Sequence, residues 1–467
     1  MAITEQNRIP GMKRIKNIHF VGIGGSGMCG IAEVLLNQGY IISGSDIKEG
    51  EATARLNSLG ALISNKHDPK LVQNADLVVM SSAIPAENVE ILAARVEGIP
   101  VIQRAEMLGE LMRYRYGIAI AGTHGKTTTT SMIAEILSVA NVSPTFVIGG
   151  ILNSARSGAV LGSGKHIVVE ADESDGSFLK LKPLSSVITN IDKDHMGTYG
   201  YDFERLKRSF VDFGNNLPFY GSLALCIDDL NVREIMPSIS RRILTYGFDS
   251  RAEYRGSAVT VDSKGLWTFK VDRGDALASL KISLPVPGYH NVRNALAAIA
   301  IASDEGIPDQ TIIEALANFS GVGRRFEVCP RVMLSQRKLT LVDDYGHHPT
   351  EIAATISALK ENTIGKLYVI FQPHRYTRTK NGFEDFRASL SKADETIVVD
   401  IYPAGEEPIP GVSSKNFENK KIKYLKSMRM VPSYLSTRVT ENDIILTLGA
   451  GDITLLGPQI LKYLDEI

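Results

Sequence analysis

The sequence predicts an α/β protein made of three consecutive α/β domains. Apolar runs of strand length recur along the chain of 467 residues, and polar or glycine-rich clusters and helical stretches follow them. A chain of this length corresponds to about three domains of about 100–200 residues each. We expect a Rossmann-like N-terminal domain at 1–115, a central P-loop ATPase-type domain at 116–325 and a Rossmann-like C-terminal domain at 326–467.

The composition favours small partners over polymers. Lys plus Arg number 51 and Asp plus Glu number 52, so the net charge of −1 attracts neither nucleic acid nor an anionic membrane. The three cysteines, Cys29, Cys226 and Cys329, lack C-x-x-C spacing, which argues against a disulfide framework and suits the reducing cytoplasm. No apolar run approaches the ~18 residues of a membrane span. We expect a cytoplasmic protein without membrane insertion, monomeric or weakly dimeric.

The most informative motif is a glycine loop between an apolar run, 116–121, and a stretch of helical spacing, 132–139. Backbone N–H groups of such a loop bind phosphate oxygens, Lys126 reaches a terminal phosphate, and Thr127 can bind Mg²⁺. The usual G-x-x-x-x-G-K-[ST] pattern needs a glycine where Ile120 stands, so the loop is a shortened variant. The predicted ATP-binding residues of the loop are Gly122, Thr123, His124, Gly125, Lys126, Thr127 and Thr128.

A second glycine motif, G-x-G-x-x-G, follows the first predicted strand, 16–21. Its residues are Gly22, Gly24, Gly25, Ser26 and Gly27, and Asp46 follows the next strand at the position that suits a ribose hydroxyl. Ser81 and Ser82 follow a later strand. The pattern specifies a diphosphate at a helix N-terminus, so NAD and a UDP-sugar are both open on these residues.

An acidic cluster follows the strand 166–169 and places four carboxylates within 170–175. Their repulsion would be relieved by a divalent cation, and hard oxygen ligands suit Mg²⁺. The preceding apolar strand should make Glu170 the least exposed member. A neighbouring predicted strand, 186–189, leads to His195. Because the carboxyl ends of parallel strands share one edge, Lys126, the carboxylates and His195 are expected to meet at one phosphate site.

Polar groups also follow the later predicted elements. His290, Asn291 and Asn294 begin an alanine-rich helix, where they act as caps or hydrogen-bond a base. Arg324 and Arg325 stand where the third block begins, and guanidinium groups bind phosphate bidentately. The strand ends of the third block carry the polar residues Asp344, His347, His374, Arg375 and Arg378.

Together these motifs resemble the Mur ligase family across essentially the whole chain. The resemblance depends on the loop 122–128, the acidic cluster 170–175, His195, the segment 290–294 and the pair 324–325. It implies a UDP-sugar rather than NAD on the first domain, ATP on the second and an amino acid on the third. The segments 343–349 and 371–378 resemble the branch that joins L-alanine to UDP-N-acetylmuramate in peptidoglycan synthesis; the branch that recycles a murein tripeptide is the alternative.

The resemblance implies roles for residues already named. Lys126 and Mg²⁺ would neutralise the charge on the transferring phosphoryl group, with Thr127 and Glu170 as metal ligands. His195 would hold a second Mg²⁺ near the attacking carboxylate. His347, His374, Arg375 and Arg378 would surround the amino acid and the developing charge. His290, Asn291, Asn294, Arg325 and Asp344 would bind ATP. The residues of the G-x-G-x-x-G motif, called the fingerprint below, would bind the UDP-sugar together with Asp46, Ser81 and Ser82. Some family members carry a carbamylated lysine, which these residues do not identify. An NAD-dependent dehydrogenase and a nucleotide-dependent switch are the rival classes.

Overall fold

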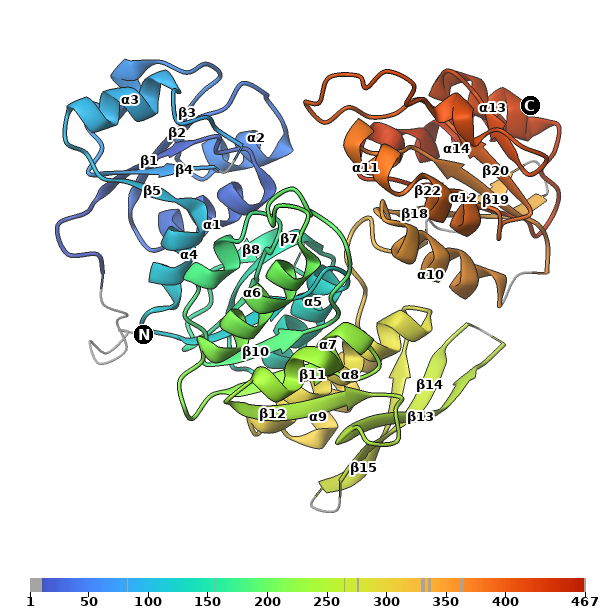
Figure 1. Ribbon diagram of the computed structural model, residues 1–467, viewed down its shortest axis with the longest axis horizontal. Helices are drawn as coiled ribbons and strands as arrows, with labels where there is room; N and C mark the ends of the chain where they lie inside the picture. Colours follow the sequence, from blue (N-terminus) through green and yellow to red (C-terminus); the bar gives the residue numbers. More distant parts are fainter. Residues whose placement is uncertain are drawn as a thin grey trace. The chain divides into compact units, whose positions relative to one another are not determined.

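The computed structural model describes residues 11–81, 83–155, 157–263, 265–274, 277–328, 332–334, 337–361 and 364–465. The chain forms two compact units (Figure 1). Unit 1 comprises residues 1–259, 268–283 and 293–319; unit 2 comprises residues 260–267, 284–292 and 320–467. Among the described residues, no helix has both the length and the apolar character needed to cross a bilayer.

The N-terminal lobe of unit 1 contains a five-stranded parallel sheet in the order β3-β2-β1-β4-β5, as in a Rossmann fold. The first βα turn therefore stands near the point where the strand order reverses. The strands are β1 (Asn17–Val21), β2 (Ile41–Ser45), β3 (Leu62–Ser64), β4 (Leu77–Met80) and β5 (Val101–Gln103). The helices are α1 (Ser26–Asn37), α2 (Glu51–Ser58), η2 (Pro69–Val72), α3 (Val89–Val96) and α4 (Arg104–Met112).

The second sheet of the chain has ten strands in the order β15-β14-β13-β12-β11-β10-β6-β9-β7-β8. Its middle strands are parallel, so the loops after β10, β6 and β9 emerge at one edge. The strands are β6 (Tyr116–Ala121), β7 (Thr145–Leu152), β8 (Ser157–Val160), β9 (His166–Glu170), β10 (Ser185–Ile188), β11 (Ser222–Cys226), β12 (Arg242–Gly247), β13 (Tyr254–Val261), β14 (Trp267–Arg273) and β15 (Leu277–Leu284). The helices along this stretch are α5 (Lys126–Val139), η3 (Ser177–Lys180), α6 (Phe203–Asn215), α7 (Leu230–Ile235), η4 (Met236–Ser238), α8 (Tyr289–Asp304) and α9 (Asp309–Ala317).

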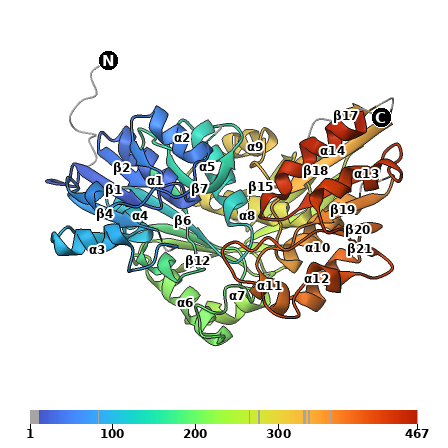
Figure 2. The ribbon, with the colours of Figure 1, turned by 90° about the horizontal axis from the view of Figure 1, so that it is seen from above.

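Helix α1 belongs to the N-terminal lobe of unit 1, which holds the five-stranded sheet, and it packs on the lobe that holds β6 to β12. It lies beside β7 and β8, as Figure 1 shows, and Figure 2 shows α1 next to β7 from above. A Cβ on Gly30 would lie 3.1 Å from the Ala159 Cβ and 3.2 Å from a methyl of Val147, so the small residue permits close packing. Phe20 and Ile31 of the first lobe share one buried cluster with Val147.

Unit 2 is built on a mostly parallel sheet in the order β16-β18-β22-β19-β20-β21, and β17 pairs with β18. The strands are β16 (Glu327–Val328), β17 (Val332–Leu334), β18 (Arg337–Asp344), β19 (Leu367–Phe371), β20 (Glu395–Val398), β21 (Ile422–Tyr424) and β22 (Ile444–Leu448). The helices are α10 (Pro349–Lys360), α11 (Tyr376–Asn381), α12 (Phe383–Leu390), η5 (Ser414–Phe417), η6 (Met428–Met430), α13 (Val431–Ser436), η7 (Asp452–Leu455) and α14 (Leu456–Asp465).

Both faces of the unit 2 sheet are covered by helices. Strand side chains alternate in direction, so Val369 and Phe371 join one buried cluster while Tyr368 and Ile370 join another. Helices α10 and α12 contribute to the first cluster and α13 and α14 to the second. These sheets and helices confirm the predicted α/β fold class.

Candidate active site

The phosphate loop connects β6 to α5 and is shaped by two glycines. Gly122 has φ +126° and Gly125 has φ +83°, in the region that favours glycine. A Cβ on Gly122 would lie 2.1 Å from Thr189 Oγ1 and 2.9 Å from the Thr189 backbone nitrogen. Gly125 is the N-cap of α5, which begins at Lys126. The helix therefore opens directly at a loop whose backbone suits phosphate oxygens.

The end of β10 holds this loop in place. The His124 N–H donates to Asn190 Oδ1 over 2.8 Å, and the Asn190 amide donates back to the His124 carbonyl over 2.9 Å. Thr189 Oγ1 donates to the same carbonyl over 2.6 Å. The Thr123 N–H donates to the Asn190 carbonyl. The loop conformation therefore depends on a neighbouring strand end as well as on its own glycines.

Lys126 forms a buried ion pair with the acidic loop that follows β9. Its Nζ lies 2.8 Å and 3.0 Å from the two carboxylate oxygens of Glu173, which is 3% exposed. The same ammonium donates to the carbonyls of Gly122 and Thr123. Burial alone would lower the pKa of Lys126, but the neighbouring carboxylates, Glu173 foremost, raise it. Lys126 is therefore held as a cation beside the phosphate loop.

Glu170 is not the least exposed acidic residue, so that expectation was wrong. Glu170 is half-buried at the end of β9, where its carboxylate accepts a hydrogen bond of 2.8 Å from the Gly149 N–H. The chain then turns, and Glu173 rather than Glu170 reaches Lys126. Tyr199 Oη donates to the Glu173 carbonyl and supports this turn. Burial depends here on the path of the loop, not on proximity to the apolar strand.

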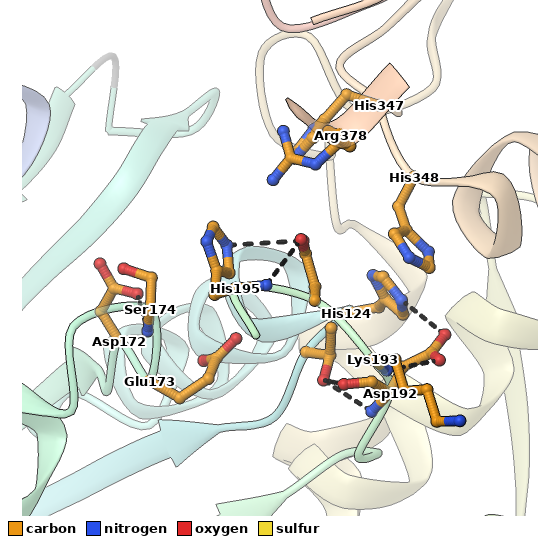
Figure 3. A network of polar contacts seen from close by, with 12 residues as sticks. His124, Asp172, Glu173, Ser174, Asp192, Lys193, His195, His347, His348 and Arg378 are labelled. Atoms are coloured by element: carbon orange, nitrogen blue, oxygen red, sulfur yellow. Dashed lines mark hydrogen bonds and ion pairs between the residues drawn. The ribbon is translucent and has the colours of Figure 1, made fainter. Parts of the chain in front are cut away.

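The loop after β10 supplies the aspartates of two histidine–aspartate pairs, one with His124 of the phosphate loop and one with its own His195 (Figure 3). His124 Nε2 lies 3.3 Å from Asp192 Oδ2, and His195 Nε2 lies 3.4 Å from Asp194 Oδ2. His195 has φ +52°, a conformation that a non-glycine residue adopts rarely. The structure thus carries Lys126, the acidic loop and His195 on loops that leave one edge of the sheet.

Residues at the start of α8 have different surroundings. Asn294 is buried, and its Oδ1 would lie 2.6 Å from a Cβ on Gly125, so it borders the phosphate loop. Asn291 is also buried, and its amide donates to the Pro287 carbonyl over 2.7 Å. His290 lies against Gly288, where a Cβ would be 2.5 Å from the imidazole. Asn294 is the member of this group that unit 1 places at the loop.

The fingerprint turn of the N-terminal lobe is tied to β2 and β4. The Gly22 N–H donates to the Ser45 carbonyl over 2.9 Å, and a Cβ on Gly22 would lie 3.1 Å from the Ser81 Cβ. Gly25 is the N-cap of α1, which begins at Ser26 and includes Gly27. Of the predicted UDP-sugar residues, Ser82 lies outside the described residues.

Asp46 borders a cavity of about 430 Å³ beside this turn. One oxygen of its carboxylate accepts the Gly24 N–H over 2.9 Å and the other accepts the Lys48 N–H over 3.0 Å. The cavity is lined mostly by polar residues, among them Asp46, Lys48, Thr53, Asn57, Ser64 and Asn65. Asp46 thus shapes the glycine turn while it lines a space beside it.

Unit 2 brings together histidine and arginine side chains at the ends of its strands. Arg378 Nη1 donates to His374 Nδ1 over 3.4 Å, and the His347 and His374 ring centroids are 5.9 Å apart. Burial, together with Arg378 and Arg375, lowers the pKa of His374 to about 4. Arg375 has φ +72°, and its N–H donates to the Tyr402 carbonyl. His374 is therefore a neutral imidazole whose Nε2 carries the proton.

In unit 2, Asp344 accepts backbone hydrogen bonds and Arg325 lies over an aromatic ring. The buried Asp344 carboxylate accepts the Phe326 N–H over 2.8 Å and the Gly346 N–H over 2.7 Å. Burial raises its pKa above the usual range. Arg325 lies 4.8 Å from the Tyr345 ring centroid. A role for Asp344 in ATP binding would have to coexist with both backbone bonds.

Three family models match successive parts of the chain. The catalytic domain of the Mur ligase family matches residues 17–116, the Mur ligase middle domain residues 120–302, and the Mur ligase glutamate ligase domain residues 324–451. The solved UDP-N-acetylmuramate-alanine ligase from Thermotoga maritima is 30% identical, and the match covers 96% of this chain and 99% of that one with a TM-score of 0.80. The chain belongs to the Mur ligase family.

Other solved Mur ligases are similar in structure. A murein peptide ligase from Psychrobacter arcticus is 24% identical, with a TM-score of 0.71 over 97% of this chain and 99% of that one. The UDP-N-acetylmuramate:L-alanyl-gamma-D-glutamyl-meso-diaminopimelate ligase from Neisseria meningitides is 27% identical, with a TM-score of 0.60 over 66% of this chain and 100% of that one. This Mur ligase is an ATP-dependent enzyme that forms an amide bond, as the family does.

Two residues of this Mur ligase site were not singled out from the sequence. Glu173 was recognised only as part of an acidic cluster, although it is the carboxylate that pairs with Lys126. Arg104 at the start of α4 contacts Asp172 of the same loop over 3.3 Å, across 68 positions of sequence. No sequence signal marks Arg104. Glu173 could have been considered, because the acidic cluster was already expected to meet Lys126.

Proposed function

We propose that this Mur ligase joins L-alanine to the carboxylate of UDP-N-acetylmuramate at the expense of ATP, as a step in peptidoglycan precursor synthesis. The observation that carries the proposal is the match to the Thermotoga maritima UDP-N-acetylmuramate-alanine ligase over nearly the full length of both chains. We propose domain limits of 1–115 for the UDP-sugar, 116–325 for ATP and 326–467 for the amino acid.

The N-terminal lobe is proposed to hold the UDP-sugar. The fingerprint turn at 22–27 and the start of α1 suit a diphosphate, and the cavity beside Asp46 suits the nucleoside. The polar lining of that cavity offers hydrogen-bond partners to a base and a ribose. A nicotinamide dinucleotide would use the same turn but would leave the loop at 122–128 without a role.

The phosphate loop is proposed to bind ATP with Mg²⁺. Thr127 in the first turn of α5, Glu170 at the end of β9 and Glu173, the partner of Lys126, offer hard oxygen donors, which fit a small divalent cation. His195 is proposed to hold a second Mg²⁺ near the attacking carboxylate. Bound Mg²⁺ would neutralise charge on the phosphoryl group being transferred. The pairing of Glu173 with Lys126 adds Glu173 to the candidate ligands.

Lys126 is proposed to change partners when ATP binds. In the structure its three donor protons are satisfied by Glu173 and the loop carbonyls of Gly122 and Thr123. A terminal phosphate offers the same ammonium stronger charge-assisted hydrogen bonds. Glu173 would then lose its counter-charge and turn towards a cation. Lys126 thus stabilises the negative charge that spreads over the phosphoryl oxygens.

The reaction balances as two successive displacements. A carboxylate oxygen of the sugar's lactyl group attacks the γ-phosphorus, the bond to the β-phosphate oxygen breaks, and ADP leaves with its electron pair. The amine nitrogen of L-alanine then attacks the acyl carbon, and the C–O bond to phosphate breaks to release inorganic phosphate. The ammonium loses its protons to solvent or to a base. Activation is needed because an unmodified carboxylate is a poor acyl donor.

Unit 2 is proposed to supply the amino-acid side of the chemistry. His374 is neutral, and because Nδ1 accepts from Arg378, its Nε2–H is left as a donor. Such a donor, with the cationic Arg375 and Arg378 and with His347, suits the carboxylate of an amino acid or a developing oxyanion. These roles follow from the donor chemistry and from family membership.

The test is phosphate release from ATP and Mg²⁺ with UDP-N-acetylmuramate. Parallel reactions contain L-alanine, glycine, L-serine or the tripeptide L-alanyl-γ-D-glutamyl-meso-diaminopimelate, and one contains no amine. Release that needs both the UDP-sugar and L-alanine supports the proposal. Release that is fastest with the tripeptide would assign the chain to the recycling branch instead.

A further inference from the structure

Arg104 contacts two segments that serve different substrates. Its Nη2 lies 3.3 Å from Asp172 Oδ2 on the acidic loop. On the other side, a Cβ added to Gly27 in the first turn of α1 would lie 2.1 Å from Arg104 Nη1 and 3.2 Å from Cζ. The guanidinium therefore rests directly on the fingerprint helix and on the loop that also contains Glu173.

Several contacts hold the start of α4 in place, so the backbone position of Arg104 is well defined. The Gln103 N–H donates to Glu106 Oε2 in a capping box. Lys180 of η3 donates to Gln103 Oε1 over 2.7 Å and lies 3.4 Å from Glu106. A Cβ on Gly109 would lie 2.9 Å from the Lys180 carbonyl oxygen, so α4 packs closely on this segment. The backbone of Arg104 is thus held while its side chain, 24% exposed, can exchange partners.

The charges around Arg104 favour an anion. The guanidinium lies on the first turn of α1, which has no acidic residue and whose N-cap, Gly25, has no side chain. A cation in that position is unfavourable unless an anion offsets it. Asp172 supplies one negative charge to Arg104, and it lies on the same loop as Glu173, the partner of Lys126. The acidic loop is therefore in contact with the fingerprint side through Arg104 and with the phosphate-loop side through Lys126.

We propose that Arg104 binds the diphosphate of the UDP-sugar, and that its ion pair with Asp172 breaks when it does so. This inference rests on the proposed function, because the UDP-sugar supplies the diphosphate. A planar guanidinium pairs bidentately with phosphate oxygens, and one already resting on the fingerprint helix needs little movement to do so. Binding of the UDP-sugar then releases a carboxylate of the acidic loop beside Lys126.

The exchange makes Asp172 a competitor of the diphosphate. Removing the charge of Asp172 should therefore strengthen UDP binding, while removing Arg104 should weaken it. Without the Arg104 guanidinium, Asp172 and the diphosphate no longer compete for it. The effects of the two substitutions on UDP affinity should therefore be strongly non-additive. A purely structural salt bridge predicts a different pattern, in which either substitution weakens binding or leaves it unchanged.

The experiment measures the dissociation constant of UDP by calorimetry on the full chain, without ATP. Arg104→Met, which keeps the aliphatic stem, should weaken UDP binding by about 10–100-fold, the range expected for lost hydrogen bonds to a charged group. Asp172→Asn should tighten it by about 3–10-fold. The double variant should bind as weakly as Arg104→Met alone. Arg104→Ala provides a second loss-of-charge variant should the methionine variant fold poorly.

Matched controls separate the effect from general charge changes. Arg113→Met removes an arginine from the other end of the same helix, where it pairs with Glu110. Asp175→Asn removes a charge from the same acidic loop, where Asp175 caps Ser177. Both controls should bind UDP within about twofold of the parent. Binding by Arg104→Met within twofold of the parent, or no tightening in Asp172→Asn, would overturn the inference. A parent chain that does not bind UDP would instead overturn the proposed UDP-sugar site.

Discussion

The ammonium of Lys126 lies 2.8 Å and 3.0 Å from the two carboxylate oxygens of Glu173, and both groups are largely buried. The phosphate loop therefore holds its lysine against an internal anion. Under the proposed function an incoming nucleotide would replace that anion, and the pair would then link nucleotide binding to the acidic loop. Two of the predictions below depend on it.

Lys126→Ala should abolish phosphoryl transfer while leaving UDP binding nearly intact. The substitution removes the cation that would face the terminal phosphate, and the fingerprint turn is at the other lobe of unit 1. We expect phosphate release to fall by about 1,000-fold or more. UDP binding measured by calorimetry is the control, and parallel loss of both would contradict the assignment of the two sites.

The same substitution should change stability in a pH-dependent way. Breaking a buried pair costs roughly 3–5 kcal/mol, because Glu173 is left without its partner. Burial already raises the pKa of Glu173, and without Lys126 its charged form is disfavoured further. The variant should therefore be most stable below the unfolded pKa of glutamate, about 4.3, and lose stability as pH rises.

Denaturant unfolding at several pH values measures this effect. Adding Glu173→Gln to Lys126→Ala should restore part of the stability at neutral pH, since the buried charge is gone. No restoration, or a Lys126→Ala variant whose stability rises with pH, would contradict the account.

Glu173→Gln should reduce activity more than Glu170→Gln. Glu173 reaches Lys126, whereas Glu170 accepts a hydrogen bond from Gly149 that a glutamine oxygen can also accept. We expect a loss of about 100-fold or more for Glu173→Gln. Rates over a range of Mg²⁺ concentrations rank the two carboxylates, and a larger loss in Glu170→Gln would favour Glu170 as the principal metal ligand.

His374 should make the protein sensitive to mild acid. Its pKa is lowered from 6.5 to about 4, so the unfolded chain binds more protons at this residue between those values. Stability contributed by the neutral imidazole is present above pH 6.5 and is lost as pH falls towards 4. His374→Gln should flatten the stability–pH curve in this window. Thermal unfolding from pH 4 to pH 7 tests this, and an unchanged slope would contradict it.

Gly122→Ala should disturb the phosphate loop more than Gly176→Ala. Both glycines have positive φ, but a Cβ on Gly122 collides with Thr189, whereas one on Gly176 meets open space among the described residues. Gly176→Ala should cost only the backbone strain, about 1 kcal/mol. Gly122→Ala should cost at least twice that and weaken binding of an ATP analogue. Equal effects in unfolding and nucleotide binding would contradict the loop geometry.

Much of the fold follows from local sequence patterns. The apolar run 116–121 and the helical spacing after it predicted β6 and α5, and the glycines between them have the positive φ values that such a loop requires. The G-x-G-x-x-G motif likewise marks the turn between β1 and α1. These features depend on a few adjacent residues, so the sequence shows them directly.

The partners of the carboxylates could not be predicted in the same way. Asp46 and Asp344 accept backbone N–H groups, and Glu173 rather than Glu170 reaches Lys126. Each outcome depends on how a loop folds back after its strand, which adjacent residues do not specify. Arg104 meets Asp172 across 68 positions of sequence, from a helix that packs on the segment around Lys180.

The most direct measurement uses UDP-N-acetylmuramate labelled with ¹⁸O in its carboxylate. Activation through an acyl phosphate transfers one carboxylate oxygen to the phosphate released in each turnover. With L-alanine and ATP present, the account predicts one ¹⁸O atom in each inorganic phosphate, detected by mass spectrometry or by the ³¹P isotope shift. Unlabelled phosphate would mean that water, not the sugar carboxylate, attacks ATP, and would contradict the proposed ligase reaction.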